Sequence, residues 1–393
     1  MRYSKGLVAF ASLLMLAAAF PVAAQEKGTF KIVTQTPLSG DQSLAGEAIK
    51  LGVQLSIEDF GGPFDAAGYK VVLQAEDDQA SPTTGVANAN RIINDPEVIG
   101  VVGHYNSGVS IPASEVYAKV GLTMISPSST SPTLTEREST RLIANRVSGR
   151  DDVQGPAAAN FAINTIQVKR AYIINDKTAY GSGLADAFEK ALTKLGGQVV
   201  LSTGVDQKET DFSTILNRAR LDKPDLIFYG GTYPQGGLII KQIREKGLSA
   251  KFLGGDGLDS SDLQKIAGAD NMTDIFFTTT SVPFGQLPTG NEFGAKYKAK
   301  FGRAPEGFSA YGYDAAHAIL AALEAELKAG VIAPSREAIA AQVRKVDFDG
   351  LTGHIAFNGK GDIKEAKYVV VAVAPDPANN KVVSIELVAA PLD

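Results

Sequence analysis

Hydroxyl-bearing residues stand where short apolar runs of the chain end, and such residues can bind a carboxylate. Ser107 follows the apolar run 98–102, and Ser128 and Thr130 follow the run 122–125. Continuous apolar runs of this length are typical of strands in parallel sheets, whose ligands bind beyond the carboxyl ends of the strands. Hydroxyls and backbone N–H groups at a strand end that leads into a helix can bind an anion without an arginine. These residues therefore predict a carboxylate site.

Two later strand ends carry residues that could bind an ammonium group. Tyr180 follows the apolar run 171–174, and Asp256 stands between Gly255 and Gly257. The two glycines allow a ligand to approach closely. A carboxylate in a closed cleft forms a charge-assisted hydrogen bond with an ammonium group. Together, the two sets of residues predict a site for a zwitterion.

The same residues also have purely local interpretations, which the spacing leaves open. Ser107 and Thr130 could be helix N-caps only, and Asp256 could be the acidic residue of an Asx turn. The adjacent Asp77 and Asp78 could suggest a divalent-metal site. We prefer the interpretation that this pair accepts hydrogen bonds from loop amides, because short acidic side chains commonly do so at strand ends.

Residue patterns of catalysis are missing from the sequence. The three histidines, His104, His317 and His354, have no zinc-ligand spacing, and the chain has no Cys. Neither a G-x-S-x-G nucleophile elbow nor a Walker P-loop occurs. The sequence therefore predicts a protein that is not an enzyme, with no catalytic residues, no cofactor and no metal site.

The first 24 residues have the order of a secretory signal peptide. Arg2 and Lys5 are basic, the segment 7–20 is apolar, and 21–24 supplies small residues for cleavage. A periplasmic location is expected, and the lack of Cys excludes a lipid anchor on cysteine as well as disulfides. The formal net charge of −5 is spread without a Lys/Arg run, so neither nucleic acid nor a membrane surface is expected as a partner.

Strands and helices are expected to alternate along the chain, which predicts parallel, doubly wound sheets. The order appears twice, so two α/β lobes are expected. Strands are predicted at 30–36, 69–75, 98–103, 122–126, 170–175, 198–203, 225–230 and 274–281. Helices are predicted at 46–60, 83–94, 152–167, 181–195, 211–221, 235–247, 293–301, 313–327 and 336–345, with one more that Pro112 helps to start. A late pair of strands, 354–357 and 367–373, is expected to be joined by the turn at Asn358-Gly359.

Several stretches in order along the chain resemble the periplasmic Leu/Ile/Val-type binding proteins of ABC importers. The matching stretches are 103–107, 111–114, 126–132, 176–181, 211–214, 229–231 and 352–353. Each motif is moderately specific, whereas the ordered set is highly specific and covers essentially the whole mature chain.

The resemblance implies a type I periplasmic binding protein: two Rossmann-like lobes joined by a three-strand hinge. The lobes would be 28–147 plus 280–352 and 148–279 plus 353–393, after a signal peptide at 1–24. An amino acid, most simply a branched-chain one, would bind between the lobes and be delivered to an ABC permease with its ATPase subunits. The protein would act as a monomer.

The resemblance also implies roles for individual residues. Ser107 and Thr130 would bind the ligand carboxylate together with the Ser128-Ser129 segment, and Tyr180 would close over the ligand from the second lobe. The ammonium group would meet Asp256. The loop on the same side would contribute Tyr229, Thr232 and Tyr233.

The chain departs from the family pattern at three places. Ala45 stands where well-known members have an aromatic residue, Ala80 and Asn106 stand where some have a disulfide, and Asp256 replaces a frequent Glu. The loss of the aromatic residue enlarges the side-chain pocket or leaves it to other residues. The predicted pocket residues are Ala45, Tyr105, Phe308 and Tyr311. An aromatic amino acid is therefore an alternative ligand. An amide or urea-like solute is a second alternative, although Asp256 favours a cationic amine over a neutral ligand.

Overall fold

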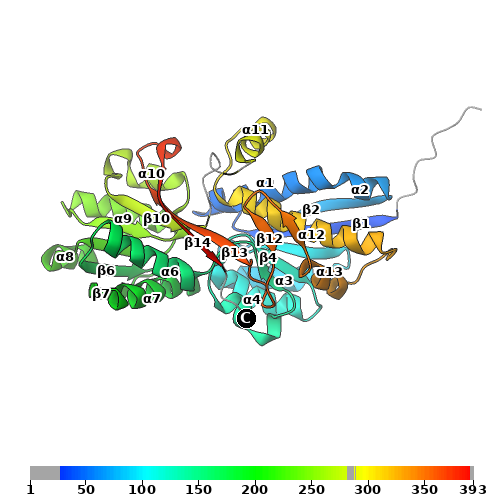
Figure 1. The fold of residues 1–393 in the computed structure, drawn as a ribbon, viewed down its shortest axis with the longest axis horizontal. Coiled ribbons are helices and arrows are strands. Elements are labelled where there is room, and N and C mark those ends of the chain that lie inside the picture. The colour runs from blue at the N-terminus through cyan, green and yellow to red at the C-terminus, as the bar shows by residue number, and fades with distance from the viewer. Residues whose placement is uncertain (1–26, 281–286, 288, 390–393) are drawn as a thin grey trace, which may run out of the picture.

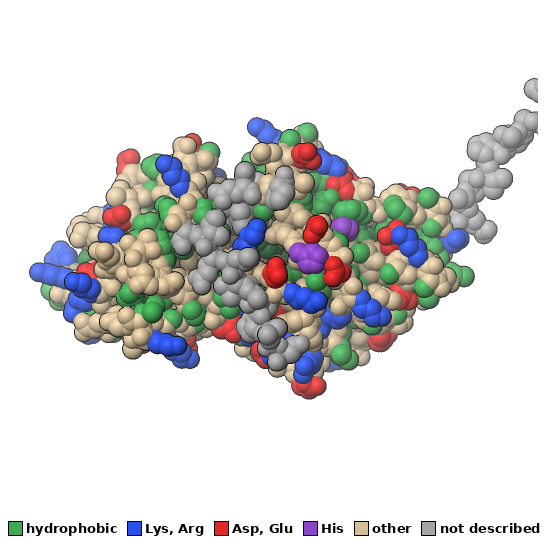
Figure 2. Space-filling view, in the orientation of Figure 1, with side chains coloured by type: hydrophobic (Ala, Val, Ile, Leu, Met, Phe, Trp, Pro, Cys, Tyr) green, Lys and Arg blue, Asp and Glu red, His purple; other side chains and the backbone are tan. Residues whose placement is uncertain are grey.

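The computed structural model describes residues 27–280, 287 and 289–389. The predicted signal peptide at 1–24 lies outside these residues. Figure 1 shows two α/β lobes placed end to end, each with helices packed on a central sheet. Acidic and basic side chains are mixed over both lobes on the face shown in Figure 2. Among the described residues, no helix combines the length and apolarity of a membrane span.

The first lobe is built on a five-stranded, fully parallel sheet in the order β2-β1-β3-β4-β5. Its strands are β1 (Gly28–Thr36), β2 (Tyr69–Asp77), β3 (Val98–Gly103), β4 (Thr123–Ser126) and β5 (Ala144–Arg146). All six residues of β3 are buried, because helices cover both faces of the sheet. The covering helices are α1 (Ser43–Phe60), α2 (Gly62–Ala66), α3 (Pro82–Ile92), α4 (Ser107–Ala118), α5 (Thr133–Glu136), α12 (Phe308–Lys328) and α13 (Arg336–Val343).

Helices α1 and α12 lie side by side although they are distant in the sequence (Figure 1). Glycines make this close contact possible. A Cβ atom on Gly52 would lie 2.0 Å from the carbonyl oxygen of Ser309, and one on Gly312 would lie 2.6 Å from that of Ile49. The late segment of the chain thus completes the first lobe and brings Phe308 to it.

The second lobe has a seven-stranded mixed sheet in the order β14-β13-β10-β9-β8-β6-β7. Strands β6 (Arg170–Asn175), β7 (Gln198–Gly204), β8 (Leu226–Gly230), β9 (Lys251–Gly254) and β10 (Ile275–Thr279) are parallel. Two antiparallel strands, β13 (Glu365–Ala372) and β14 (Lys381–Ala389), extend the sheet beyond β10. The main helices are α6 (Asp151–Asn160), α7 (Ala179–Lys194), α8 (Ser213–Asp222), α9 (Tyr233–Glu245) and α10 (Asp262–Ala267), while α11 (Gly290–Phe301) lies above the first lobe.

The predicted doubly wound α/β fold is confirmed, but the predicted late strand pair is wrong. Strand β12 (His354–Ala356) pairs with β11 (Asp347–Asp349) in a separate ribbon, whereas β13 pairs with β10 and β14. Only the bridge between Phe357 and Ile363 joins the two segments across the turn. The apolar residues of β13 are better buried as an extension of the second sheet, where Tyr368–Val371 are buried.

Two helix starts also differ from the prediction. Helix α12 begins at Phe308 rather than at 313. Pro112 lies inside α4 and does not start it, because the extended backbone of Asn106 (φ −91°, ψ 130°) sets the beginning of this helix at Ser107. The early start matters for the site, since it places the first N–H groups of α4 directly after β3.

A buried cluster of ion pairs connects two of the chain segments that run between the lobes. Arg146, at the end of β5, is fully buried and donates from Nε to Asp362 Oδ1 at 2.7 Å. Arg150 donates from Nη1 to the other carboxylate oxygen at 2.8 Å. Burial alone would raise the pKa of Asp362, but the charges of the two arginines hold it below its usual value. The hydrogen bond from Arg150 to Asp362 therefore joins the segment before α6 to the segment before β13.

Asp362→Asn should lower the free energy of unfolding by about 3–5 kcal/mol, because it leaves the fully buried guanidinium group of Arg146 without its carboxylate partner, whereas Arg150 keeps Glu136 and Asp152. Chemical denaturation measures the change. Glu138→Gln is the matched control: the Glu138 side chain is 89% exposed and meets Arg141 at 3.5 Å, so a change of no more than about 0.5 kcal/mol is expected. Equal effects of the two substitutions would contradict this account of the hinge.

Candidate functional site

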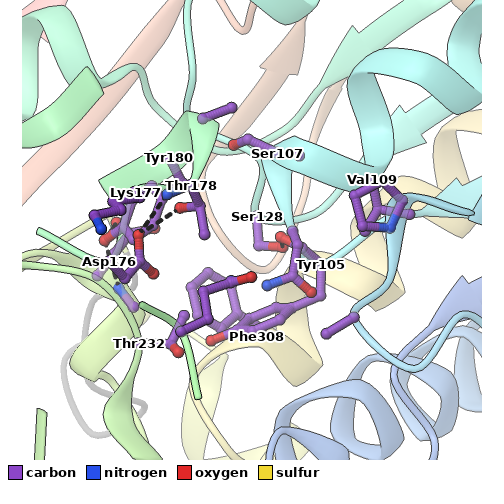
Figure 3. Close-up of a pocket in the computed structure, with 18 residues that line it drawn as sticks. Tyr105, Ser107, Val109, Ser128, Asp176, Lys177, Thr178, Tyr180, Thr232 and Phe308 are labelled. Carbon is purple, nitrogen blue, oxygen red and sulfur yellow. Dashed lines mark hydrogen bonds between the residues drawn. The ribbon is translucent and has the colours of Figure 1, made fainter. Parts of the chain in front are cut away.

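A cavity of about 360 Å³ lies between the two lobes. The first lobe contributes the loops after β2, β3 and β4, and the second lobe contributes the loops after β6, β8 and β9. In Figure 3, Tyr105, Ser107, Ser128 and Phe308 face Tyr180 and Thr232 across this space. Because the strands are parallel, their carboxyl ends meet at one edge of each sheet. The cavity is therefore the place that the alternation of strands and polar loops predicted.

The first-lobe wall of the cavity holds the predicted anion-binding groups. Ser107 is the first residue of α4, and the N-cap residue is Asn106, whose side chain makes no capping hydrogen bond. The N-cap interpretation of Ser107 is thus wrong. Ser128 also lines the cavity and donates its hydroxyl to the carbonyl of Tyr105 at 2.9 Å. The start of α4 presents N–H groups and a partial positive charge to this wall.

Ser129 and Thr130 lie behind this wall and do not line the cavity. The Ser129 hydroxyl is 2.6 Å from that of Ser110 and donates to the His104 carbonyl at 3.2 Å. Thr130 is no N-cap either, since α5 follows Pro132. The Thr130 hydroxyl lies beside the carboxyl group of Asp151, and its carbonyl accepts the Asp151 N–H at 2.9 Å. These two residues support the wall in this arrangement.

Asp256 and Tyr180 form a hydrogen-bonded pair on the opposite wall. Tyr180 donates from Oη to Asp256 Oδ1 at 2.8 Å, and the same hydroxyl accepts the Gly257 N–H at 2.8 Å. A Cβ atom on Gly255 would lie 2.6 Å from the Tyr180 hydroxyl, so the glycine lets Tyr180 approach. Asp256 is 2% exposed, and burial raises its pKa to about 6 although the Tyr180 hydrogen bond acts in the opposite direction.

Asp151, which the sequence prediction did not single out, lies close to Asp256 behind the cavity wall and does not line the cavity. It is the first residue of α6 and 1% exposed, and neither of its carboxylate oxygens has a hydrogen-bond partner among the described residues. Burial, and then the charge of Asp256, raises its pKa well above the usual value. In the sequence it is indistinguishable from the acidic residues that commonly begin helices. Its position beside Asp256 arises only from the fold.

The loop after β8 places its three predicted residues differently. Thr232 lines the cavity and accepts a hydrogen bond from Gln42 Nε2 at 3.4 Å, across the two lobes. Tyr233 donates from Oη to the carbonyl of Asp41 at 2.7 Å, also across the lobes. Tyr229 is fully buried and donates to Gln235 at 2.7 Å, so it supports the loop from inside the second lobe.

Two of the four predicted pocket residues line the cavity. Tyr105 and Phe308 do so, with their rings edge-to-face at 5.6 Å and 75°. Ala45 and Tyr311 belong to the buried core instead, where the Tyr311 ring lies 6.1 Å from that of Phe308 and its Oη donates to the Thr280 carbonyl. Further lining residues that the sequence prediction did not single out for the site are Pro82, Val109, Lys177 and Gln207, together with Ala80 and Asn106.

The acidic pair after β2 behaves as predicted from its position. Asp77 accepts hydrogen bonds from the N–H groups of Leu38 and Gln79, both at 2.9 Å, and Asp78 accepts one from Ala80 at 3.0 Å. Among the residues that the structure describes, no group of His, Cys, Asp and Glu has the arrangement of a metal site.

Known proteins with the same fold and similar sequences define the family. Residues 29–378 match the model of the periplasmic binding protein family. The Leu/Ile/Val-binding protein homolog 2 of Brucella abortus is 36% identical over 85% of this chain and 87% of its own length. The amino acid binding protein of Pseudomonas aeruginosa is 34% identical, with the same coverage of each chain.

A solved structure agrees with these sequence relatives. The leucine binding protein of Thermotoga maritima has a TM-score of 0.81 and 30% identity, over 92% of this chain and 99% of that one. Its similarity extends through both lobes, because the covered share is nearly the whole described chain. The chain therefore belongs to the periplasmic binding protein family, as a homologue of Leu/Ile/Val-binding proteins.

Proposed function

We propose that this protein is a periplasmic receptor that binds an aliphatic, branched-chain amino acid between its lobes and delivers it to an ABC permease. The observation that carries the proposal is the pair Asp151 and Asp256. Both carboxylates are buried, and neither forms an ion pair within the part of the chain that the structure describes, so a ligand ammonium group would supply the missing counter-charge. The relatives' names and the aromatic-lined, partly apolar cavity support the choice of ligand class.

The ligand would be oriented by opposite charges on the two walls. Its carboxylate would accept hydrogen bonds from Ser107, Ser128 and the first N–H groups of α4, and Thr130 would act from behind that wall. Its ammonium group would lie between Asp256 and Asp151, where Tyr180 fixes one carboxylate. The side chain would then extend along Tyr105 and Phe308, with Ala45 and Tyr311 acting from the second layer.

Closure of the lobes would couple binding to transport. The ligand groups on the two walls are satisfied together only when the lobes meet, so binding favours the closed state. Contacts of Gln42 with Thr232 and of Tyr233 with the Asp41 carbonyl add to that state. The proposed crossings lie at 147/148, 279/280 and 352/353, near the Arg146–Asp362 cluster. A monomer in this state would dock on a permease, whose ATPase subunits drive release of the ligand.

Calorimetric titration of the mature protein, unfolded and refolded to remove bound ligand, tests the proposal. Leucine, isoleucine or valine should bind one to one and more tightly than the other amino acids. Selective binding of phenylalanine or tyrosine would favour the alternative of an aromatic amino acid. If only acetamide or urea bound, the amino-acid assignment would be wrong.

Asp256→Asn should weaken leucine binding by about 1.5–3 kcal/mol, or roughly 10- to 150-fold, because a neutral amide replaces the charged acceptor of the ammonium group. The dissociation constant from calorimetry measures this change. Asp259→Asn, in the same loop, is the matched control and should change it little. An unchanged dissociation constant in a folded Asp256→Asn protein would remove Asp256 from the ligand site.

Leucine affinity should fall as the pH is lowered through about 6. The raised pKa of Asp256, caused by burial, means that protons compete with the ligand ammonium group at and below that pH. Well below pH 6 the affinity should fall toward tenfold per pH unit. Titrations between pH 5 and 8 measure the profile. A flat profile in the native protein would contradict the proton competition.

Asp151→Asn should stabilise the ligand-free protein while it weakens leucine binding. The pKa of Asp151 is higher in the folded protein than in the unfolded chain. The native protein therefore loses stability as the pH rises from the unfolded pKa toward the folded pKa. The Asn variant does not lose stability in this way, because Asn does not titrate. The difference in unfolding free energy should therefore grow with pH, by at most about 1.4 kcal/mol per unit. Denaturation at pH 4.5, 6 and 7.5 measures it.

Asp152→Asn provides the control for the stability measurement. The Asp152 side chain is 41% exposed and its carboxylate accepts a 2.7 Å bond from Arg150. Its substitution should change stability slightly and should not affect leucine binding. If Asp151→Asn destabilised the protein at pH 7.5, its carboxyl group would be stabilised by a contact other than the ligand.

A further inference from the structure

A second buried polar cluster lies behind the first-lobe wall of the cavity. His104 and Asp78 are both fully buried, and His104 Nδ1 is 2.8 Å from Asp78 Oδ2. Neither residue lines the cavity. His104 immediately follows β3, and Asp78 immediately follows β2, so the pair joins two of the loops that form the wall. A buried pair of this kind is costly unless its hydrogen bonds are well made.

The backbone of His104 joins a third loop to the same cluster. Its carbonyl accepts hydrogen bonds from the hydroxyl of Ser126 at 2.9 Å, at the end of β4, and from that of Ser129 at 3.2 Å, in the loop after β4. Its N–H donates to Ser110 Oγ at 3.2 Å, inside α4. A change in the position of His104 would therefore be transmitted to both segments that carry the carboxylate-binding groups.

Asp78 extends the cluster to the rim of the cavity. Its Oδ1 accepts the N–H of Ala80 at 3.0 Å, and Ala80 lines the cavity. Its own N–H donates to the carbonyl of Thr36 at 3.2 Å, at the end of β1. One side-chain pair thus fixes the loop after β2 relative to the loop after β3.

The hydrogen-bond partners of the His104 ring determine which ring nitrogen carries the proton. Gln35 Nε2 donates to the Gly85 carbonyl at 2.8 Å, which fixes the orientation of its amide, and the same nitrogen lies 3.3 Å from both ring nitrogens. Tyr117 Oη lies 3.3 Å from Nε2. Since Gln35 Nε2 can only donate, Nε2 of the ring is the acceptor and Nδ1–H donates to Asp78. This directional bond holds the ring in one orientation.

We propose that His104, held by Asp78, is a positioning residue that preorganises the first-lobe wall to receive the ligand carboxylate. The assignment of that anion as an amino-acid carboxylate rests on the proposed function. Binding groups keep their geometry only when a supporting layer fixes them. His104 is the point where the loops after β2, β3 and β4 are connected by direct hydrogen bonds. The alternative role is a contribution to the stability of the lobe alone.

Two substitutions at position 104 separate the hydrogen bond from the ring. His104→Phe keeps a ring but cannot donate to Asp78. His104→Asn carries an amide nitrogen on Cγ, as Nδ1 is carried in histidine, and can restore the bond. His317→Phe is the control in the same lobe, because His317 stacks on Phe60 at 3.6 Å and does not line the cavity. Leucine and leucinamide, which lacks the carboxylate, are the ligands.

His104→Phe should weaken leucine binding by roughly 10- to 100-fold, the range seen when outer-layer partners of a binding group are lost. Its leucinamide affinity should change far less, so the preference for leucine over leucinamide should shrink. His104→Asn should recover most of that preference, and His317→Phe should keep all of it. Equal losses for the two ligands in His104→Phe, or no loss for either, would overturn the positioning role.

Hydrogen exchange of the ligand-free proteins gives a readout that needs no ligand. In His104→Phe, the backbone amides of 105–110 and 128–131 should exchange at least tenfold faster, while those of β6 remain unchanged. Uniformly faster exchange in both lobes would mean a stability effect only and would contradict the proposal. If the native protein bound no amino acid, the proposed function would fail while the exchange data still decided the role of His104. Should His104→Phe not fold, Asp78→Ala removes the same hydrogen bond from its other partner and takes the place of His104→Phe in the comparison.

Discussion

The buried carboxyl groups of Asp151 and Asp256 are the constraint on which the site depends. Both are at most 2% exposed, and the oxygens of Asp151 lack hydrogen-bond partners among the described residues. Burial of uncompensated charge is unfavourable, so the pKa values of both groups are raised. A cationic ligand removes this penalty and adds charge-assisted hydrogen bonds. In the proposed function, the unfavourable burial of these two groups would contribute to the selectivity for an ammonium group.

The fold places the two carboxyl groups close together although they come from segments that are distant in the sequence. Asp151 begins α6 directly after the first crossing, whereas Asp256 follows β9 in the second lobe. The opposite wall comes from the first lobe, where the start of α4 and Ser128 supply donors without a full positive charge. In the proposed function, a zwitterion would therefore meet acceptors on one side and donors on the other. Movement of the lobes changes how many of these groups reach it at once.

The sequence was sufficient to predict the fold class and the position of the cavity, because both follow from apolar runs that end in polar loops. Ser107, Tyr180 and Asp256 could be found in this way. Asp151 could not, because an acidic residue at a helix start has no distinctive pattern. Ala45 was expected in the pocket but is buried in the core and does not line the cavity, whereas Phe308 at the start of α12 does. The partner of β13 likewise depended on burial against β10 and not on the nearby Asn-Gly turn.

The most direct test of the account compares leucine with 4-methylpentanoate, which has the same side chain and carboxylate but no ammonium group. Titration of the refolded native protein at pH 7.5 measures both dissociation constants. If Asp256 and Asp151 select the ammonium group, 4-methylpentanoate should bind at least about 100-fold more weakly, because two charge-assisted contacts are lost and the carboxylates remain uncompensated. Equal affinities for the two ligands would contradict the central claim that the buried carboxylate pair defines the ligand.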